Sequence, residues 1–323
     1  MLYNIKIQIF IASFNRPEYL KEAIHSVMNQ TVISIIELII SDNSTDNDVQ
    51  VMMATDYASI KYVRRTPSLP AADHFKAIIS DVTSEFYMIF HDDDVMHPQL
   101  VECLYNELTI NSNLVAASAN GWYYYPQKNI IQIIYFSLYN KQKFDNPFAF
   151  INKYLIGLGV APFSGYMYKS SVYRKSFISN EDGGKYGDVS FLLKGLDYGS
   201  ILWLNKPLMY YRIHDNNDSG QISFDDREKI IKYFIEKIKI RERSLLIKLY
   251  RMHDYNVIIK HYIACRVNNG DVKKAIYYFL KNIHVFVLLN IPILLYKYLI
   301  RLLSKKDNYK LNHTKITNVI NVG

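Results

Sequence analysis

Alternation of β-branched apolar runs with amphipathic helical patterns is the feature that most constrains this sequence. Apolar runs at 5–12, 35–40 and 86–90 have the length and composition of buried strands. Apolar residues at helical spacing follow the first and the third run. This order is typical of a mostly parallel sheet covered by helices, an α/β fold. The 323 residues, 50% of them hydrophobic, suffice for one large domain or two of ordinary size.

A polar loop follows each of these three strands. The loops are 13–16, 42–46 and 92–94. In open α/β sheets, ligands bind outside the carboxyl ends of the strands, so we expect the three loops to line one crevice. The first loop leads into a helix that we expect Asn15 to cap, with Pro17 in its first turn.

Three adjacent carboxylates, Asp92, Asp93 and Asp94, follow the third strand directly. Such carboxylates repel one another until a cation neutralises them, and hard divalent cations prefer oxygen ligands. The triplet therefore predicts a site for a metal-bound diphosphate. The alternative is an acidic, solvated turn before the next helix. Asp42 also has two interpretations: it would accept hydrogen bonds from a nucleobase or ribose, or it would form an Asx-turn with the residues after it.

The last third of the chain differs in charge from the rest. Residues 226–323 carry 20 Lys and Arg against 7 Asp and Glu, whereas residues 1–225 carry 18 against 23. Gly and Pro become rare near residue 225, and long Ile, Leu, Tyr and Lys periodicity begins. We therefore place a domain boundary there, with a helical domain at 226–323. A basic tail on an acidic domain predicts an anionic partner for the tail, such as a membrane surface or nucleic acid.

Two segments of this tail have an amphipathic or strongly apolar pattern. Ile230, Ile231, Phe234 and Ile238 recur on one helical face, and the stretch 277–303 is rich in Leu and Ile but is interrupted before it could span a bilayer. We expect a helix pair lying on an anionic membrane surface. The alternatives are a helical domain packed on the first domain, and an apolar surface that serves a homo-oligomer. No nucleic-acid-binding motif accompanies the charge, so nucleic acid is not expected.

The cysteines and the N-terminus bear on the compartment. Cys103 and Cys265 form no CxxC or Cys/His spacing, which argues against a disulfide framework or a zinc site. The first apolar run is too short for a secretory leader. We expect a cytoplasmic protein, peripheral on the inner face of the cytoplasmic membrane.

Three motifs in this order resemble family 2 glycosyltransferases of the bacterial polysaccharide-biosynthesis type. They are IASFNRP at 11–17, ELIISDNSTD at 37–46 and HDDD at 91–94. The resemblance covers about residues 1–220 and implies the GT-A fold, a Rossmann-like nucleotide-binding mixed sheet flanked by helices. It also implies a nucleotide-diphosphate sugar donor, a UDP-sugar before others, whose diphosphate is held by Mn²⁺ or Mg²⁺.

The resemblance assigns roles to individual residues. Asp42 would hydrogen-bond the base, and the triplet would stand for the family's DxD motif, in which Asp92 faces the ribose and Asp94 ligates the metal. The segment 210–219 resembles the closing motif of bacterial members, in which His214 would reach the metal or the diphosphate. Asp93 would lie at the donor together with residues along the nucleotide, which are Ala12, Phe14, Arg16, Arg65 and His74.

Glycosyl transfer with inversion needs one carboxylate to take the proton from the attacking hydroxyl. Asp188 is the expected base, because YGDVSF at 186–191 resembles the family's Glu/Asp-Asp motif with Gly187 in place of the first acid. Glu181 and Asp182 are the competing choice.

The resulting expectation is a metal-dependent, inverting glycosyltransferase that assembles capsule, O-antigen or another surface polysaccharide on a saccharide or lipid-linked acceptor. A nucleotidyltransferase is an alternative, but it would carry a Gly-rich, basic phosphate loop after the first strand, and 13–16 is not one. A non-catalytic carbohydrate-binding or membrane-binding scaffold is a second alternative.

Overall fold

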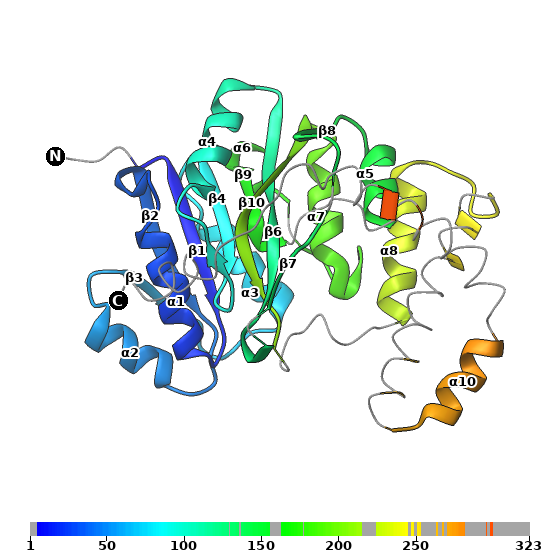
Figure 1. Cartoon of the computed structure of the whole chain (residues 1–323). Coiled ribbons are helices and arrows are strands. Elements are labelled where there is room, and N and C mark those ends of the chain that lie inside the picture. The colour runs from blue at the N-terminus through cyan, green and yellow to red at the C-terminus, as the bar shows by residue number, and fades with distance from the viewer. Residues whose placement is uncertain are drawn as a thin grey trace.

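The computed structural model describes most of the chain. The described residues are 5–128, 130–135, 137–155, 163–176, 178–214, 224–244, 247–248, 251–252, 263, 267, 270–281, 295 and 298–299. Figure 1 shows a central sheet between helices, with α8 and α10 on the right of the view, beyond α7.

The ten described strands form one mixed sheet in the order β3-β2-β1-β4-β9-β6-β10-β5, with β7 on β6 and β8 on β10. Strands β1, β2 and β4, which correspond to the three predicted strands, run parallel, and β3, which was not predicted, adds parallel to β2. Strand β9 lies antiparallel between β4 and β6, and β10 pairs with β6 in parallel. The strands are β1 (Ile7–Ser13), β2 (Ile36–Asp42), β3 (Lys61–Arg64), β4 (Phe86–His91), β5 (Val95–Met96), β6 (Leu114–Tyr125), β7 (Ile130–Ile133), β8 (Lys141–Phe144), β9 (Tyr166–Lys169) and β10 (Ser200–Arg212).

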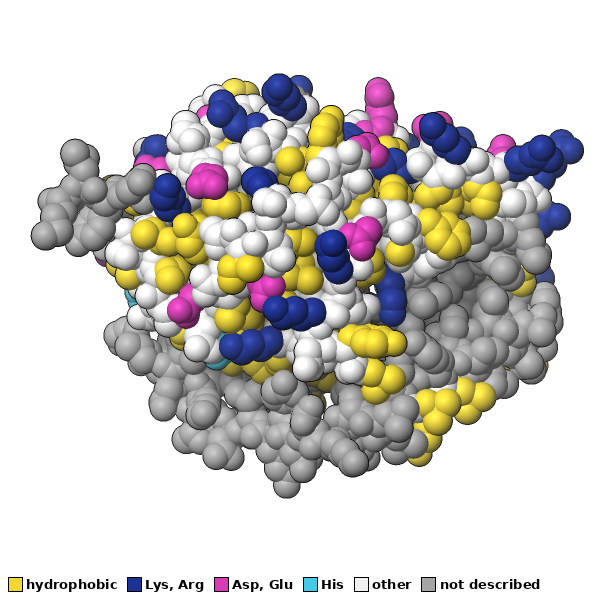
Figure 2. Space-filling model, turned by 90° about the horizontal axis from the view of Figure 1, so that it is seen from above, with side chains coloured by type: hydrophobic (Ala, Val, Ile, Leu, Met, Phe, Trp, Pro, Cys, Tyr) yellow, Lys and Arg dark blue, Asp and Glu magenta, His cyan; other side chains and the backbone are white. Residues whose placement is uncertain are grey.

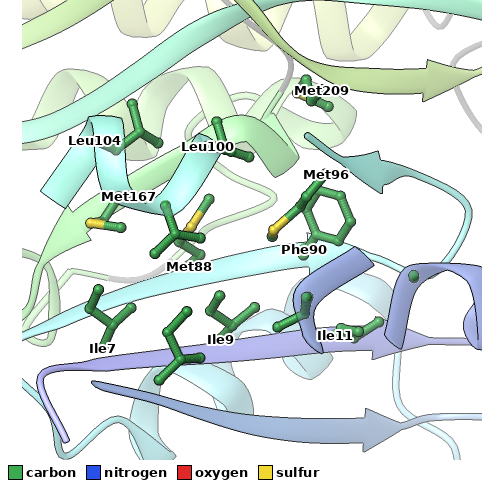
Figure 3. Packing of buried hydrophobic residues seen from close by; sticks show 14 of the residues in the cluster. Ile7, Ile9, Ile11, Met88, Phe90, Met96, Leu100, Leu104, Met167 and Met209 are labelled. Carbon is green, nitrogen blue, oxygen red and sulfur yellow. The ribbon is translucent and has the colours of Figure 1, made fainter. Parts of the chain in front are cut away.

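Helices cover both faces of the sheet because strands such as β1 are apolar on both sides. Ile7, Ile9 and Ile11 point towards α4, as Figure 3 shows, whereas Phe10 packs in the cluster on the opposite face. The cluster around Ile7, Ile9 and Ile11 includes residues of α1, α2 and α4. The cluster around Phe10, on the opposite face, includes residues of α3, α5, α7 and α8. The helices are α1 (Pro17–Met28), α2 (Asp48–Asp56), α3 (Ala71–Asp81), α4 (Leu100–Ile110), α5 (Pro147–Leu155), α6 (Ser170–Tyr173), α7 (Gly187–Gly195), α8 (Phe224–Lys237) and α10 (Val272–Lys281), with 3-10 turns at Ile33–Ile35, Pro126–Lys128, Phe163–Gly165 and Gly184–Tyr186.

The start of α1 differs from the sequence prediction. Arg16, not Asn15, is the N-cap residue, and its side chain makes no capping hydrogen bond. Asn15 has a left-handed backbone with φ of 54°, a conformation that Asn tolerates better than most residues. Its side-chain oxygen accepts a hydrogen bond from the Thr45 N–H at 2.8 Å, and its own N–H donates to the Ser44 hydroxyl at 2.8 Å. Asn15 therefore joins two of the polar loops instead of capping the helix.

The apolar face of α8 is buried within the protein. Ile230, Ile231 and Phe234 are at most 2% exposed and belong to the same cluster as Phe191 of α7. This face is therefore not available to a bilayer, contrary to the sequence-based interpretation. Of the stretch 277–303, the structure describes 277–281, 295 and 298–299, and the rest lies outside the described residues.

None of the described helices combines the length and the apolar character needed to cross a membrane. On the face drawn in Figure 2, the described Lys and Arg side chains are scattered among Asp, Glu and hydrophobic side chains. A nucleic-acid-binding surface concentrates positive charge on one face or stripe, and this described face does not do so.

Candidate functional site

The carboxyl ends of β1, β2 and β4 bring the three polar loops together, as predicted. Ser13 of β1 pairs with Asp42 of β2, and Ala12 pairs with His91 of β4. The Asn43 N–H donates to the Ser13 carbonyl at 2.9 Å. The loops therefore share one edge of the sheet.

Each carboxylate of the triplet is held by a different part of the chain. Asp92, Asp93 and Asp94 are at most 7% exposed, so they do not form a solvated acidic turn. Asp92 Oδ2 accepts the Phe14 N–H at 2.9 Å. Asp94 Oδ2 accepts the Ser164 hydroxyl at 2.6 Å.

Asp93 is surrounded by cationic or potentially cationic groups. Its Oδ2 bonds to the Arg16 guanidinium and lies 3.0 Å from His214 Nε2. Arg16 also lies 3.4 Å from Asp92 Oδ1. The structure thus brings Arg16, His214 and the triplet into direct contact.

The three carboxyl groups differ in how readily they ionise. Burial raises the pKa of Asp94 well above its ordinary value, and the Asp93 charge raises it further. Burial raises the pKa of Asp92 to about 7, opposed by Arg16. The pKa of Asp93 is lowered: burial alone would raise it, but His91, Arg16 and His214 outweigh that effect. The neighbouring cationic side chains therefore do not fully offset the cost of ionising the buried triplet.

The arrangement fits a divalent cation. Among the described residues, His91, Asp93 and Asp94 offer ligand atoms that all lie within 4.8 Å of one another. Carboxylate oxygens suit Mg²⁺ and Mn²⁺, and a neutral imidazole is a suitable additional ligand. Sequence reasoning passed over His91 as a ligand, although it directly precedes the triplet.

Asp42 is fully buried at the end of β2. Its Oδ1 accepts the Ser44 N–H at 2.9 Å, which is the Asx-turn considered from the sequence. Its Oδ2 accepts the Tyr62 hydroxyl at 2.6 Å and the Arg64 guanidinium at 2.5 Å. Burial and the bond to Asp42 raise the pKa of Tyr62 to about 12. Tyr62 and Arg64 are two positions apart on β3 and therefore point to the same face of the sheet. The sequence did not identify them as partners of Asp42, because only the pairing of β3 with β2 brings them to it.

Arg65 and His74 meet at a single hydroxyl beside this carboxylate. Ser41 Oγ lies 3.0 Å from Arg65 Nε and 2.9 Å from His74 Nε2. Arg65 also pairs with Asp81 at 2.6 Å. Burial and Arg65 lower the pKa of His74 to about 4, so its imidazole is neutral at pH 7. Of the remaining predicted donor residues, Ala12 is half-buried and Phe14 is 43% exposed.

Asp188 lies in the first turn of α7. Burial raises its pKa to about 6, opposed by the backbone N–H groups of Val189 and Asp188 itself. Phe191 of this helix packs edge-on against Phe163, with ring centroids 6.4 Å apart. The residue after Phe163 is Ser164, which donates its hydroxyl to Asp94, so these contacts connect α7 to the triplet. Of the competing acids, Glu181 is exposed, and Asp182 forms an ion pair with Lys194 at 2.6 Å.

Solved structures show where else this architecture occurs. Staphylococcus aureus TarS 1–349 in complex with UDP-GlcNAc aligns with a TM-score of 0.57 at 13% identity, over 83% of this chain and 76% of that one. At this identity the likeness concerns the fold alone. It confirms the predicted GT-A architecture.

Protein sequences of known families give a more specific result. Glycosyltransferase GlyA of Streptococcus pneumoniae is 22% identical over 284 residues, which are 84% of this chain but 39% of GlyA. The dTDP-rhamnosyl transferase RfbG of Shigella flexneri is 26% identical over 238 residues, 68% of this chain and 77% of RfbG. The family profile described as glycosyl transferase family 2 matches residues 8–176. This match extends over more than half of the sequence, and the chain therefore belongs to glycosyl transferase family 2.

Proposed function

We propose that this glycosyltransferase is metal-dependent and inverting, and moves a sugar from a nucleotide-diphosphate sugar to a hydroxyl of a saccharide or lipid-linked acceptor. The observation that carries the proposal is the buried triplet at the junction of three loops, with a pKa of Asp94 well above the ordinary range. A bacterial surface polysaccharide such as capsule or O-antigen is the proposed product. The structure of TarS in complex with UDP-GlcNAc and the similarity to the dTDP-rhamnosyl transferase RfbG support a nucleotide-sugar donor.

The donor would lie along the carboxyl edge of the sheet. Asp42, whose charge is balanced by Arg64, would lie at the base end of the donor. The side chain of Phe14 is exposed beside the triplet and offers an apolar surface to the nucleotide. Arg16 is positioned for the diphosphate by its bonds to Asp92 and Asp93.

Asp93 and Asp94 would hold the cation, with His214 or His91 as a further ligand. A divalent cation bound there would stabilise the negative charge of the departing nucleoside diphosphate. Ser164 and Arg16 keep the carboxylates in place through their hydrogen bonds.

Asp188 would act as the general base. Its carboxylate takes the proton of the acceptor hydroxyl as the oxygen bonds to the anomeric carbon and the bond to the diphosphate breaks. A single displacement of this kind inverts the configuration at that carbon. A pKa of about 6 suits the task, because the group is ionised at neutral pH and is a stronger base than an ordinary Asp.

Thermal unfolding of the full chain with UDP, dTDP and their sugars, each with Mn²⁺ and with a chelator, tests this function. A nucleotide at 100 times its dissociation constant should add about 2.7 kcal/mol to the free energy of unfolding. We expect one nucleoside diphosphate to stabilise the protein only when the metal is present. A protein that responds to no nucleotide in either condition would contradict the proposal and favour a non-catalytic scaffold.

We also propose peripheral attachment to the inner face of the cytoplasmic membrane through α10. Val272, Ile276, Tyr277 and Leu280 are 48–60% exposed there, and lysines flank them. Anionic lipid attracts basic residues by about 1 kcal/mol each, while the apolar side chains insert between headgroups.

Sedimentation with lipid vesicles tests this attachment. We expect binding to vesicles with anionic lipid, loss of binding in high salt, and weaker binding after joint replacement of Lys273 and Lys274 by Glu. Joint replacement of Lys61 on β3 and Lys141 on β8 by Glu is the control of equal charge change. Equal binding of all variants to neutral and anionic vesicles would refute the attachment.

A further inference from the structure

Arg212, the last residue of β10, contacts the acidic triplet and lies two positions before His214, the residue expected from the motif at 210–219. Its side chain is 4% exposed. Its backbone N–H donates to Asp94 Oδ1 at 3.1 Å, and its Nε–H donates to the Asp93 carbonyl at 2.8 Å. Its terminal guanidinium nitrogen bonds to Glu22 of α1. One residue therefore contacts the acidic turn twice and reaches a separate helix.

Two aromatic rings enclose the guanidinium. Its central carbon lies 4.6 Å from the ring centroid of Tyr19 and 5.3 Å from that of Tyr124. The Tyr19 ring also contacts the ring of His214, with centroids 5.2 Å apart. Burying a cation is costly unless it is paired and hydrogen-bonded, and stacking on aromatic faces further compensates a guanidinium. The enclosure therefore fixes the plane of the Arg212 side chain.

We propose that Arg212 is the positioning residue that holds the metal-binding turn in register with α1 and with His214. The proposal rests on the proposed metal-dependent function. Three parts of the site meet at this residue: the turn that carries Asp93 and Asp94, the helix that follows the donor loop, and the end of β10 that leads to His214.

Lysine cannot replace this arrangement. The guanidinium donates from Nε to one partner and from a terminal nitrogen to another in a fixed plane, whereas an ammonium group is a single point of charge. With Arg212→Lys, the Asp93 carbonyl or Glu22 loses its partner while the positive charge remains. Groups that orient metal ligands typically contribute 10–100-fold to metal affinity, so we expect Arg212→Lys to weaken metal binding by about that factor.

The experiment measures Mn²⁺ binding to the purified full chain by electron paramagnetic resonance, with steady-state kinetics alongside. We expect Arg212→Lys to raise the Mn²⁺ dissociation constant about 10–100-fold, and saturating Mn²⁺ to restore part of the transfer rate. Arg251→Lys is the matched control, because Arg251, like Arg212, is paired with glutamate: with Glu228 at 2.5 Å and Glu242 at 3.0 Å. This control should leave Mn²⁺ affinity unchanged.

A second variant separates positioning from folding. Glu22→Gln removes one charge at the far end of the contact, where the side chain is 28% exposed, and should give a smaller loss of Mn²⁺ affinity in a folded protein. If folded Arg212→Lys and Glu22→Gln both bind Mn²⁺ as the parent does, the positioning role is wrong. If the parent itself binds no Mn²⁺, the metal-dependent function fails first and the role of Arg212 fails with it.

Discussion

Replacement of Asp188 by Asn is expected to lower the rate of sugar transfer by about two to four orders of magnitude, the usual contribution of a general base. Donor binding should be retained, because Asp188 lies on α7 and not on the loops that carry the triplet. Transfer from nucleotide sugar to acceptor and calorimetric binding of the nucleotide with Mn²⁺ measure the two effects separately. The isosteric amide keeps the shape of the side chain and removes only its basicity.

The pH dependence gives a second readout of the same carboxylate. Burial raises the pKa of Asp188 to about 6, and a base works only when ionised, so kcat/KM should fall as the pH drops through about 6. Glu181→Gln distinguishes the competing base: if that variant loses transfer and Asp188→Asn keeps it, the assignment is wrong.

Asp188→Asn should also stabilise the fold. The folded-state pKa of Asp188, about 6, lies above the ordinary value of 3.8, so ionisation costs stability. This cost is absent below about pH 4, grows as the pH rises, and is complete above about pH 6. Asp188→Asn should therefore raise the free energy of unfolding at pH 8 by about 1–3 kcal/mol. Equal denaturant midpoints for parent and variant at pH 8 would contradict this cost.

Asp94→Ala is expected to abolish metal-dependent donor binding. Removing a direct ligand should exceed the 10–100-fold effect of an outer-shell partner, so we expect a loss of roughly 100-fold or more in Mn²⁺ affinity. Calorimetric titration of the nucleoside diphosphate with and without Mn²⁺ measures it. In the presence of a chelator, the variant should bind the nucleotide as weakly as the parent does, because Asp42 and its partners remain in place.

Asp145→Asn is a suitable control for the Asp94 experiment. Asp145 is also a hydrogen-bonded aspartate, paired with Lys143 and Ser200, and lies between β8 and α5. Unchanged metal dependence in Asp94→Ala would remove Asp94 from the set of ligands.

The parallel half of the sheet and the meeting of its loops could be predicted from the sequence, because both follow from local periodicity and a general rule about strand ends. The contacts of Arg212 could not, since its partner Asp94 lies 118 positions away. The pairing of Arg64 with Asp42 is hidden for the same reason: it depends on strand order.

Two errors have a different physical cause. The Asn15 prediction failed because Asn is favoured both at helix N-caps and in left-handed loops, and only the neighbouring Ser44 and Thr45 select the loop. The apolar face of α8 was interpreted as a membrane surface because amphipathicity shows that a helix covers something apolar without showing what it covers.

The burial of α8 has a consequence for where this protein can be divided into fragments. Ile230 and Phe234 are packed in the cluster that also contains Phe191, three positions after Asp188. A fragment cut at the composition change near residue 225 would lose these side chains and expose the underside of the helix that carries the expected base. A fragment that keeps α7 supported must therefore extend beyond residue 237 into the basic tail, because Ile247 belongs to the same cluster.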